Sequence, residues 1–178
     1  MRDVPRPPTP VSTISPLPVT TPIVIPVASP VASPIASPVS LPDTGIFLPD
    51  QASRVLTLVN QERTKASLRA LAGAPQLDQL ARARSKDMGD RQYLSHYTPE
   101  GTNIFDMFRK AGIAFRTAGE NIAKNNALSS DTARVAFAGW MNSPGHKANI
   151  LNTAYGQLGV GVYRTTAGIC YLVQVFTD

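Results

Sequence analysis

Apolar side chains recur at helical spacing in four stretches of the chain. Residues three and four apart share one face of an α-helix, so each stretch predicts an amphipathic helix. The first follows Pro49-Asp50, the third is capped by Thr102-Asn103 and ends at Gly112, and the fourth runs from the cap Ser129-Ser130-Asp131 to Ser143-Pro144-Gly145. The apolar positions are Val55, Leu58, Val59 and Ala66; Leu77, Leu80, Ala81 and Met88; Ile104, Phe105, Phe108 and Ala111; and Ala133, Ala136, Phe137, Trp140 and Met141.

The C-terminal part of the chain changes to an alternating period. Leu158, Val160 and Val162 alternate with glycines, and residues 169–176 are almost wholly apolar, which predicts a hairpin that turns at residues 165–168. Because the last strand is apolar on both faces, helices are expected to cover the sheet on both sides. The pattern therefore predicts an α+β fold, a three-layer α-β-α sandwich around a central, mainly antiparallel sheet.

The first 49 residues have a different composition. Thirteen of the sixteen prolines lie before Asp50, among Val, Ser, Thr and Ala. Proline removes backbone donors and favours extended geometry, so residues 1–49 are expected to form a disordered, semi-rigid spacer, and residues 50–178 a single domain. An arbitrary tail without a positional role remains the alternative interpretation of this segment.

Charge and cysteine content exclude several classes of protein. The net charge is +5, but the basic residues are scattered, and Arg82, Arg84 and Lys86 alternate across a helix, so no nucleic-acid partner is expected. Cys170 is the only cysteine and lies in an apolar strand, where it is expected to be a small buried hydrophobe. No apolar stretch reaches the length of a membrane span, and residues 1–5 show no signal core.

Three ionisable residues stand out as candidates for function. His96 and His146 are the only histidines, and each lies in a segment expected to be a turn or a helix edge. Glu120 lies in the small, apolar strand segment 118–123, and a buried carboxylate needs partners. Glu120 is either a structural acid held by backbone amides or by an arginine, or it joins the two imidazoles, and the spacing does not choose between these interpretations.

Five ordered motifs give the domain a family resemblance. They are Asn60-Gln61-Glu62-Arg63, Ser95-His96, Gly119-Glu120-Asn121-Ile122-Ala123, the segment from Trp140 to Leu151, and Gly159-Val160-Gly161. Together they resemble the bacterial branch of the CAP superfamily, the cysteine-rich secretory, antigen 5 and pathogenesis-related 1 proteins, also called SCP-like extracellular proteins. The resemblance covers about Leu56 to Phe176 and leaves the proline-rich segment outside.

This resemblance implies an α-β-α sandwich with a central cleft onto which His96, Glu120 and His146 converge. Asn121, Ser143 and Gln174 are then expected around these three residues. Many relatives carry a second glutamate just after the tryptophan, but Met141 follows Trp140 here. Two imidazoles and a carboxylate suit a divalent metal, so His96 and His146 are candidate ligands of Zn²⁺.

Three functions are compatible with these residues. The preferred one is a monomeric, non-catalytic binding module, extracellular or at the cell surface, whose cleft takes a lipid, a peptide or a cell-wall fragment. The second is a metal-assisted hydrolase or protease in which Glu120 is the base. The missing second acid argues against this function. The third is a structural or adhesive surface protein in which the proline-rich segment matters most.

Overall fold

The computed structural model describes residues 44–178. The predicted spacer, residues 1–49, therefore lies outside the described residues except for residues 44–49. In that short stretch, strand β1 (Ile46–Phe47) pairs with strand β4 (Gln157–Arg164), and Pro49 is the first residue of helix α1 (Pro49–Lys65). The folded part thus begins earlier than the expected boundary at residue 50, because composition alone does not reveal this short backbone pairing.

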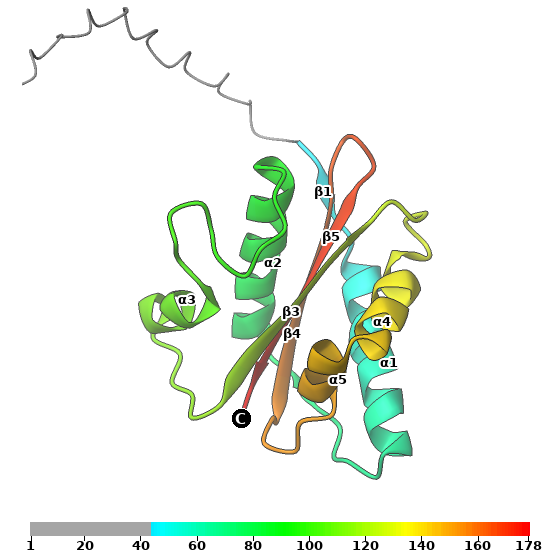
Figure 1. Ribbon diagram of the computed structural model, residues 1–178, viewed down its shortest axis with the longest axis vertical. Helices are drawn as coiled ribbons and strands as arrows, with labels where there is room; N and C mark the ends of the chain where they lie inside the picture. The colour runs from blue at the N-terminus through cyan, green and yellow to red at the C-terminus, as the bar shows by residue number, and fades with distance from the viewer. Residues whose placement is uncertain (1–43) are drawn as a thin grey trace, which may run out of the picture. The chain divides into compact units, whose positions relative to one another are not determined.

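Five helices and five strands make up the described part of the chain (Figure 1). In chain order they are β1 (Ile46–Phe47), α1 (Pro49–Lys65), β2 (Ala72–Gly73), α2 (Pro75–Asp90), α3 (Ile104–Ala111), β3 (Ala118–Asn125), α4 (Thr132–Asn142), α5 (Pro144–Ile150), β4 (Gln157–Arg164) and β5 (Cys170–Thr177).

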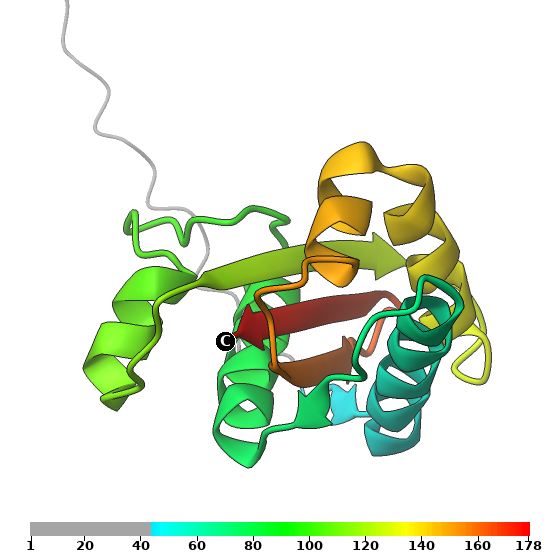
Figure 2. The same cartoon turned by 90° about the horizontal axis from the view of Figure 1, so that it is seen from below.

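The strands form one sheet in the order β1-β4-β5-β3, and β2 adds a short parallel pairing to β4. All pairings along the main path are antiparallel, and β3 lies at one edge. Helices α2 and α3 lie on one side of the sheet, and α1, α4 and α5 lie on the other (Figures 1 and 2). The predicted three-layer sandwich with a mainly antiparallel sheet is confirmed.

Strand β5 is buried on both faces, as its apolar sequence predicts. Cys170, Leu172 and Phe176 pack in the core that includes residues of α1 and α4, whereas Val173 and Val175 pack in the core that includes residues of α2 and α3. Since neighbouring residues of a strand point to opposite faces, two separate cores share this one strand. The same alternation decides which helix layer each polar residue of β3 meets.

Helix α3 has the caps that the sequence predicts, but one of its predicted core residues, Phe105, is partly exposed. The side chain of Asn103 accepts hydrogen bonds from the backbone N–H groups of Phe105 and Asp106, and Gly112 ends the helix in the left-handed region at φ 67°. Phe105 is 38% exposed, so it lies at the border of the core instead of inside it.

Helix α5 is an element that the sequence pattern did not predict. Ser143-Pro144-Gly145 ends α4 as expected, but Pro144 is also the first residue of α5. A proline fits the first turn of a helix, where no intrahelical partner exists for an N–H group. His146 therefore lies in the first turn of α5, which matches the helix-edge alternative and not the turn.

Helix α2 packs directly on the backbone of β4. A Cβ atom added to Gly159 would lie 2.2 Å from the carbonyl carbon of Leu77, and one added to Gly161 would lie 2.2 Å from the carbonyl oxygen of Ala81. Only glycine allows this approach. The close packing brings α2, and with it Arg84, down to the level of the sheet.

Within residues 44–178, no helix is both long and apolar enough to span a membrane.

Candidate functional site

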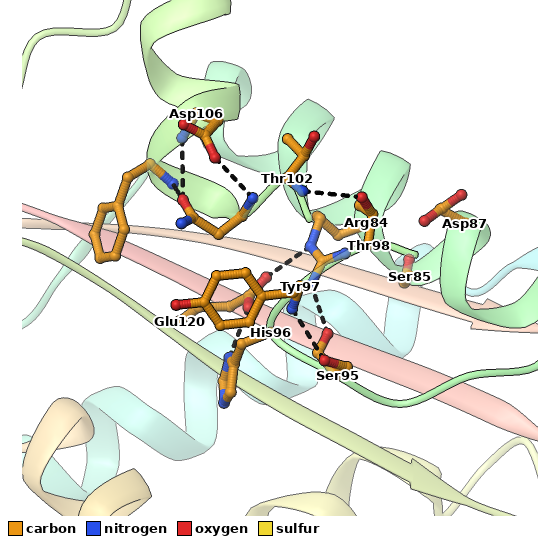
Figure 3. A network of polar contacts seen from close by, with 12 residues as sticks. Arg84, Ser85, Asp87, Ser95, His96, Tyr97, Thr98, Thr102, Asp106 and Glu120 are labelled. Atoms are coloured by element: carbon orange, nitrogen blue, oxygen red, sulfur yellow. Dashed lines mark hydrogen bonds and ion pairs between the residues drawn. The ribbon is translucent and has the colours of Figure 1, made fainter. Parts of the chain in front are cut away.

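Glu120 lies in β3 on the face of the sheet covered by α2, and its carboxylate contacts two residues. Nε of Arg84 donates a hydrogen bond to Oε1 at 3.0 Å, and Nδ1 of His96 lies 2.8 Å from Oε2. Figure 3 shows Glu120 between the guanidinium of Arg84 and the ring of His96. Arg84 is 1% exposed and Glu120 is 7% exposed, so this ion pair is buried, whereas the side chain of His96 is 51% exposed.

Arg84 also holds the segment that carries His96. Its two terminal nitrogens donate to the hydroxyl of Tyr93 at 3.0 Å and to the backbone carbonyl of Ser95 at 2.8 Å. Burial works against the guanidinium charge, but the hydrogen bond and the charge of Glu120 outweigh it and raise the pKa of Arg84. Arg84 therefore stays cationic and fixes both Glu120 and the backbone next to His96.

The network continues from Arg84 along α2. The hydroxyl of Tyr93 donates in turn to the carboxylate of Asp87. Burial and this hydrogen bond raise the pKa of Tyr93 to about 12. Tyr93 is therefore a neutral phenol that joins Arg84 to Asp87 at neutral pH.

A second polar network lies on the opposite face of β3. Nδ2 of Asn121 donates to the backbone carbonyl of His146 at 3.1 Å and to Oε1 of Gln174 at 2.9 Å. Nδ2 of Asn149 donates to Oδ1 of Asn121 at 2.9 Å and to the carbonyl of Glu120 at 3.3 Å. Asn121 and Gln174 are both fully buried, so this network ties α5 to the two strands.

The outer edge of β3 is bonded by side chains of the α4-α5 segment. Nε1 of Trp140 donates to the carbonyl of Ile122 at 3.1 Å, and Asn149 donates to the carbonyl of Glu120. Trp140 is 1% exposed. Two carbonyl groups that a further strand would need are thus already satisfied within the domain.

The structure does not bring the six predicted site residues into one cluster. His96 and Glu120 are in direct contact, and Asn121 and Gln174 form the network that holds the backbone of His146. His146 lies in α5, and its Nδ1 is buried without a hydrogen-bond partner among the residues the structure describes. Ser143 lies between α4 and α5, and its side chain does not cap α5.

The structure identifies Arg84 and Asn149 as members of the site that sequence reasoning missed. Arg84 was grouped with scattered surface cations, yet it follows Leu77 and Ala81 at helical spacing and precedes Met88 on the same buried stripe. A basic residue on an apolar helix face was the signal that could have found it. Asn149 belongs to the motif from Trp140 to Leu151, but the sequence pattern assigns no specific role to this residue.

The donor atoms do not fit a resident zinc ion. In the described range 44–178, no group of three or more His, Cys, Asp or Glu side chains could hold a metal. Glu120 already contacts both Arg84 and His96, and zinc sites in proteins need at least three protein ligands.

Two large hollows of the domain lie away from the histidines. One, of about 620 Å³, lies over α1 beside Leu56 and Asn60. The other, of about 590 Å³, lies between α2 and α3 and reaches Arg84 and Met107. Neither is lined by His96, Glu120 or His146, so the contact between His96 and Glu120 lies outside both hollows.

Protonation of His146 is expected to destabilise the fold. Burial, and then the charge of nearby His96, lower the pKa of His146 below its ordinary value near 6.5. Because the unfolded chain binds this proton more readily, the stabilisation is complete above about pH 6.5 and is lost as the pH falls toward the lower pKa of the folded state. Unfolding by urea at several pH values between about 5 and 8 measures the slope.

The matched variant for this measurement is His146→Gln, which keeps a polar side chain but does not titrate. Carboxylates contribute to the pH dependence of both proteins, so the difference between the two slopes isolates His146. Equal slopes in the two proteins would contradict the assignment.

Comparisons with known proteins identify the family of this chain. A family model for CAP, the cysteine-rich secretory protein family, matches residues 56–176. The uncharacterized protein YkwD of Bacillus subtilis is 42% identical over 108 residues, which are 61% of this chain and 40% of that protein. The uncharacterized membrane protein YlbC of the same organism is 35% identical over 111 residues, which are 62% of this chain and 31% of that protein. The chain thus matches less than half the length of either curated relative.

Solved structures share the same fold. An extracellular protein of Bacillus anthracis that contains an SCP domain has a TM-score of 0.64 at 35% identity, covering 73% of this chain and 41% of that one. An outer surface protein of Borrelia burgdorferi has a TM-score of 0.68 at 21% identity, covering 76% of this chain and 98% of that one. The second likeness, at this low identity, concerns the fold alone.

Proposed function

Because this chain belongs to the CAP family of cysteine-rich secretory proteins, we propose that residues 44–178 form an extracellular, non-catalytic binding module whose ligand contacts His96 at the edge of the sheet. The ligand classes that this proposal includes are lipids, peptides and cell-wall fragments. One observation carries it: His96 is half exposed, yet its ring is held by a buried carboxylate. A fixed polar side chain at the surface loses little freedom on binding.

The contacts of Glu120 argue against the alternative, a metal-assisted hydrolase. In that mechanism a free carboxylate accepts a proton from a metal-bound water. Here Glu120 is 7% exposed and is bonded to Arg84 and His96, which leaves it poorly placed to act as that base. Among residues 44–178, no Ser, Thr or Cys side chain forms a hydrogen bond with His96 that would mark a nucleophile, and Cys170 is buried.

An extracellular or cell-surface location is part of the same proposal. One structural neighbour, at 35% identity, is named as an extracellular protein that contains an SCP domain. The proposed role of the proline-rich segment as a spacer, and the alternative of a mainly adhesive protein, concern residues outside the described range. Secretion of the full chain by its host, measured by fractionation, tests the location separately from binding.

His96→Ala is expected to weaken ligand binding about tenfold or more, because one hydrogen bond of about 1 kcal/mol and the contact surface of the ring are lost together. The measurement is a nuclear magnetic resonance titration of the full chain with three probes: phosphatidylglycerol vesicles, soluble peptidoglycan fragments and a mixture of unstructured peptides. One of the three should shift the resonances of the segment around His96 in a saturable way.

The control for this titration is Lys124→Ala, since Lys124 is exposed on β3, the strand of Glu120, but is not part of either polar network. It should bind as the unmodified protein does. If none of the probes binds saturably, or if His96→Ala binds like the control, the proposal fails. If the protein hydrolyses ester or peptide substrates and this activity depends on His96, the protein is an enzyme and not a non-catalytic binding module.

A further inference from the structure

The buried charge of Arg84 determines the protonation of the groups around it. Arg84 is almost completely buried and has no acceptor atoms, so its guanidinium needs a negative partner inside the domain. Glu120 is the carboxylate that it contacts directly. Glu120 is therefore present as a carboxylate, which only accepts hydrogen bonds.

The carboxylate of Glu120 determines which ring nitrogen of His96 carries the proton. Nδ1 of His96 lies 2.8 Å from the carboxylate oxygen, and an acceptor there requires a proton on Nδ1. In the neutral imidazole the other ring nitrogen, Nε2, then carries a lone pair. Since the buried carboxylate binds the Nδ1 end, Nε2 belongs to the part of the half-exposed ring that is available to a ligand.

Building on the proposed binding function, we infer that Arg84 sets the polarity of this site: through Glu120 it makes Nε2 of His96 a hydrogen-bond acceptor, so the ligand must present a donor such as a hydroxyl or an amide N–H. Arg84 is thus a positioning residue that selects ligands without touching them. Tyr97, the next residue in sequence, is 57% exposed and gives the same segment an aromatic side chain at the surface.

Replacing Glu120 by glutamine is expected to reverse the polarity. The guanidinium of Arg84 only donates, so it holds the amide oxygen of the new side chain and turns the NH₂ group toward His96. Nδ1 must then accept, and the proton moves to Nε2. Glutamine has nearly the shape of glutamate and keeps the hydrogen bond to Arg84, but the guanidinium loses its charged partner, so the variant should be less stable than the unmodified protein. Amide spectra that match those of the unmodified protein outside the site establish that the variant is folded before its tautomer is measured.

Two-bond ¹⁵N–¹H correlation spectra of the full chain, recorded at about pH 8, distinguish the two tautomers of a neutral imidazole. The unmodified protein should have its His96 proton on Nδ1, and Glu120→Gln should have it on Nε2. A proton on Nε2 in the unmodified protein, or an unchanged tautomer in Glu120→Gln, would overturn the inference.

The part played by Arg84 needs its own variants. In Arg84→Met/Glu120→Gln both buried charges are gone, the amide can turn its oxygen back to His96, and the proton should return to Nδ1. Tyr93→Phe removes a hydrogen bond of Arg84 without touching Glu120, so it should leave the tautomer unchanged. If the double variant keeps its proton on Nε2, Arg84 does not set the polarity.

A pair of small probes tests the ligand class. Benzyl alcohol carries a hydroxyl donor, whereas benzyl methyl ether has the same ring and oxygen but no donor. The alcohol should shift the His96 resonances of the unmodified protein at millimolar concentration and the ether should not, while Glu120→Gln should respond to both. Equal responses of the unmodified protein to the two probes would refute a donor-selective site.

These outcomes are separable from failure of the proposed function. The tautomers are measured in the free protein, so they stand even if lipid, peptide and wall probes all fail to bind. Conversely, saturable binding of one of those probes with the opposite tautomer would retain the binding module and reject the role of Arg84.

Discussion

Arg84→Met is expected to lower the free energy of unfolding by about 3–5 kcal/mol, because it leaves the carboxylate of Glu120 buried without its charged partner. The change also removes the hydrogen bonds to Tyr93 and to the carbonyl of Ser95. Urea unfolding followed by circular dichroism measures the loss. The tryptophan signal gives an independent probe, since Trp140 lies in the other core.

Two further variants complete this experiment. Arg84→Met/Glu120→Leu should recover much of the loss, because a buried ion pair replaced as a whole by apolar groups costs little. Arg91→Met breaks two ion pairs at the surface, with Glu100 and with Asp87, and should change stability far less. A loss in Arg84→Met no larger than that in Arg91→Met would show that the ion pair with Glu120 is not buried in solution.

Gly161→Ala is expected to cost about 3 kcal/mol or more, since its methyl group would lie 2.2 Å from the carbonyl oxygen of Ala81 and 2.5 Å from the backbone nitrogen of Arg82. These are backbone atoms of α2, so no side chain can rotate away. The whole helix must move from the sheet, which also pulls Arg84 away from Glu120. Thermal and urea unfolding both report the change.

The matched control is Gly139→Ala in α4, where an added Cβ meets no atom within 4 Å. Alanine has the higher helix propensity, so this variant should gain about 0.5–1 kcal/mol. The opposite signs of the two glycine substitutions form the test. A Gly161→Ala protein as stable as the unmodified one would mean that α2 does not rest on β4 as closely as described.

The periodic elements of the fold could be predicted from the sequence, and the irregular ones could not. The alternation in β4 and the apolar run of β5 give the hairpin, and the double-faced burial of β5 gives the three layers. Helix α5 could not be predicted because a proline after α4 indicates the end of a helix, and the same Pro144 also begins the next helix. Strand β1 could not be predicted because two residues are too few to show an alternating hydrophobic pattern.

The site divides in the same way. Glu120 and Asn121 could be recognised as polar residues in a buried strand, and the alternation along a strand sends them to opposite faces. The partners of these two residues depend on how α2 and α5 pack on the sheet. These contacts join segments that are far apart in the sequence, so a local pattern does not reveal them. The pairing of Glu120 with Arg84 therefore needed coordinates, although an arginine held by this acid was one of the alternatives that the residue types allowed.

Strand β3 borders the sheet, and such borders are where protein chains join one another into shared sheets. Trp140 and Asn149 cover two of the carbonyl groups of this border from inside the same molecule. An extended segment from a neighbouring molecule would have to displace a buried indole before it could add to this rim. Copies of the domain can therefore be concentrated on a surface without fusing along β3.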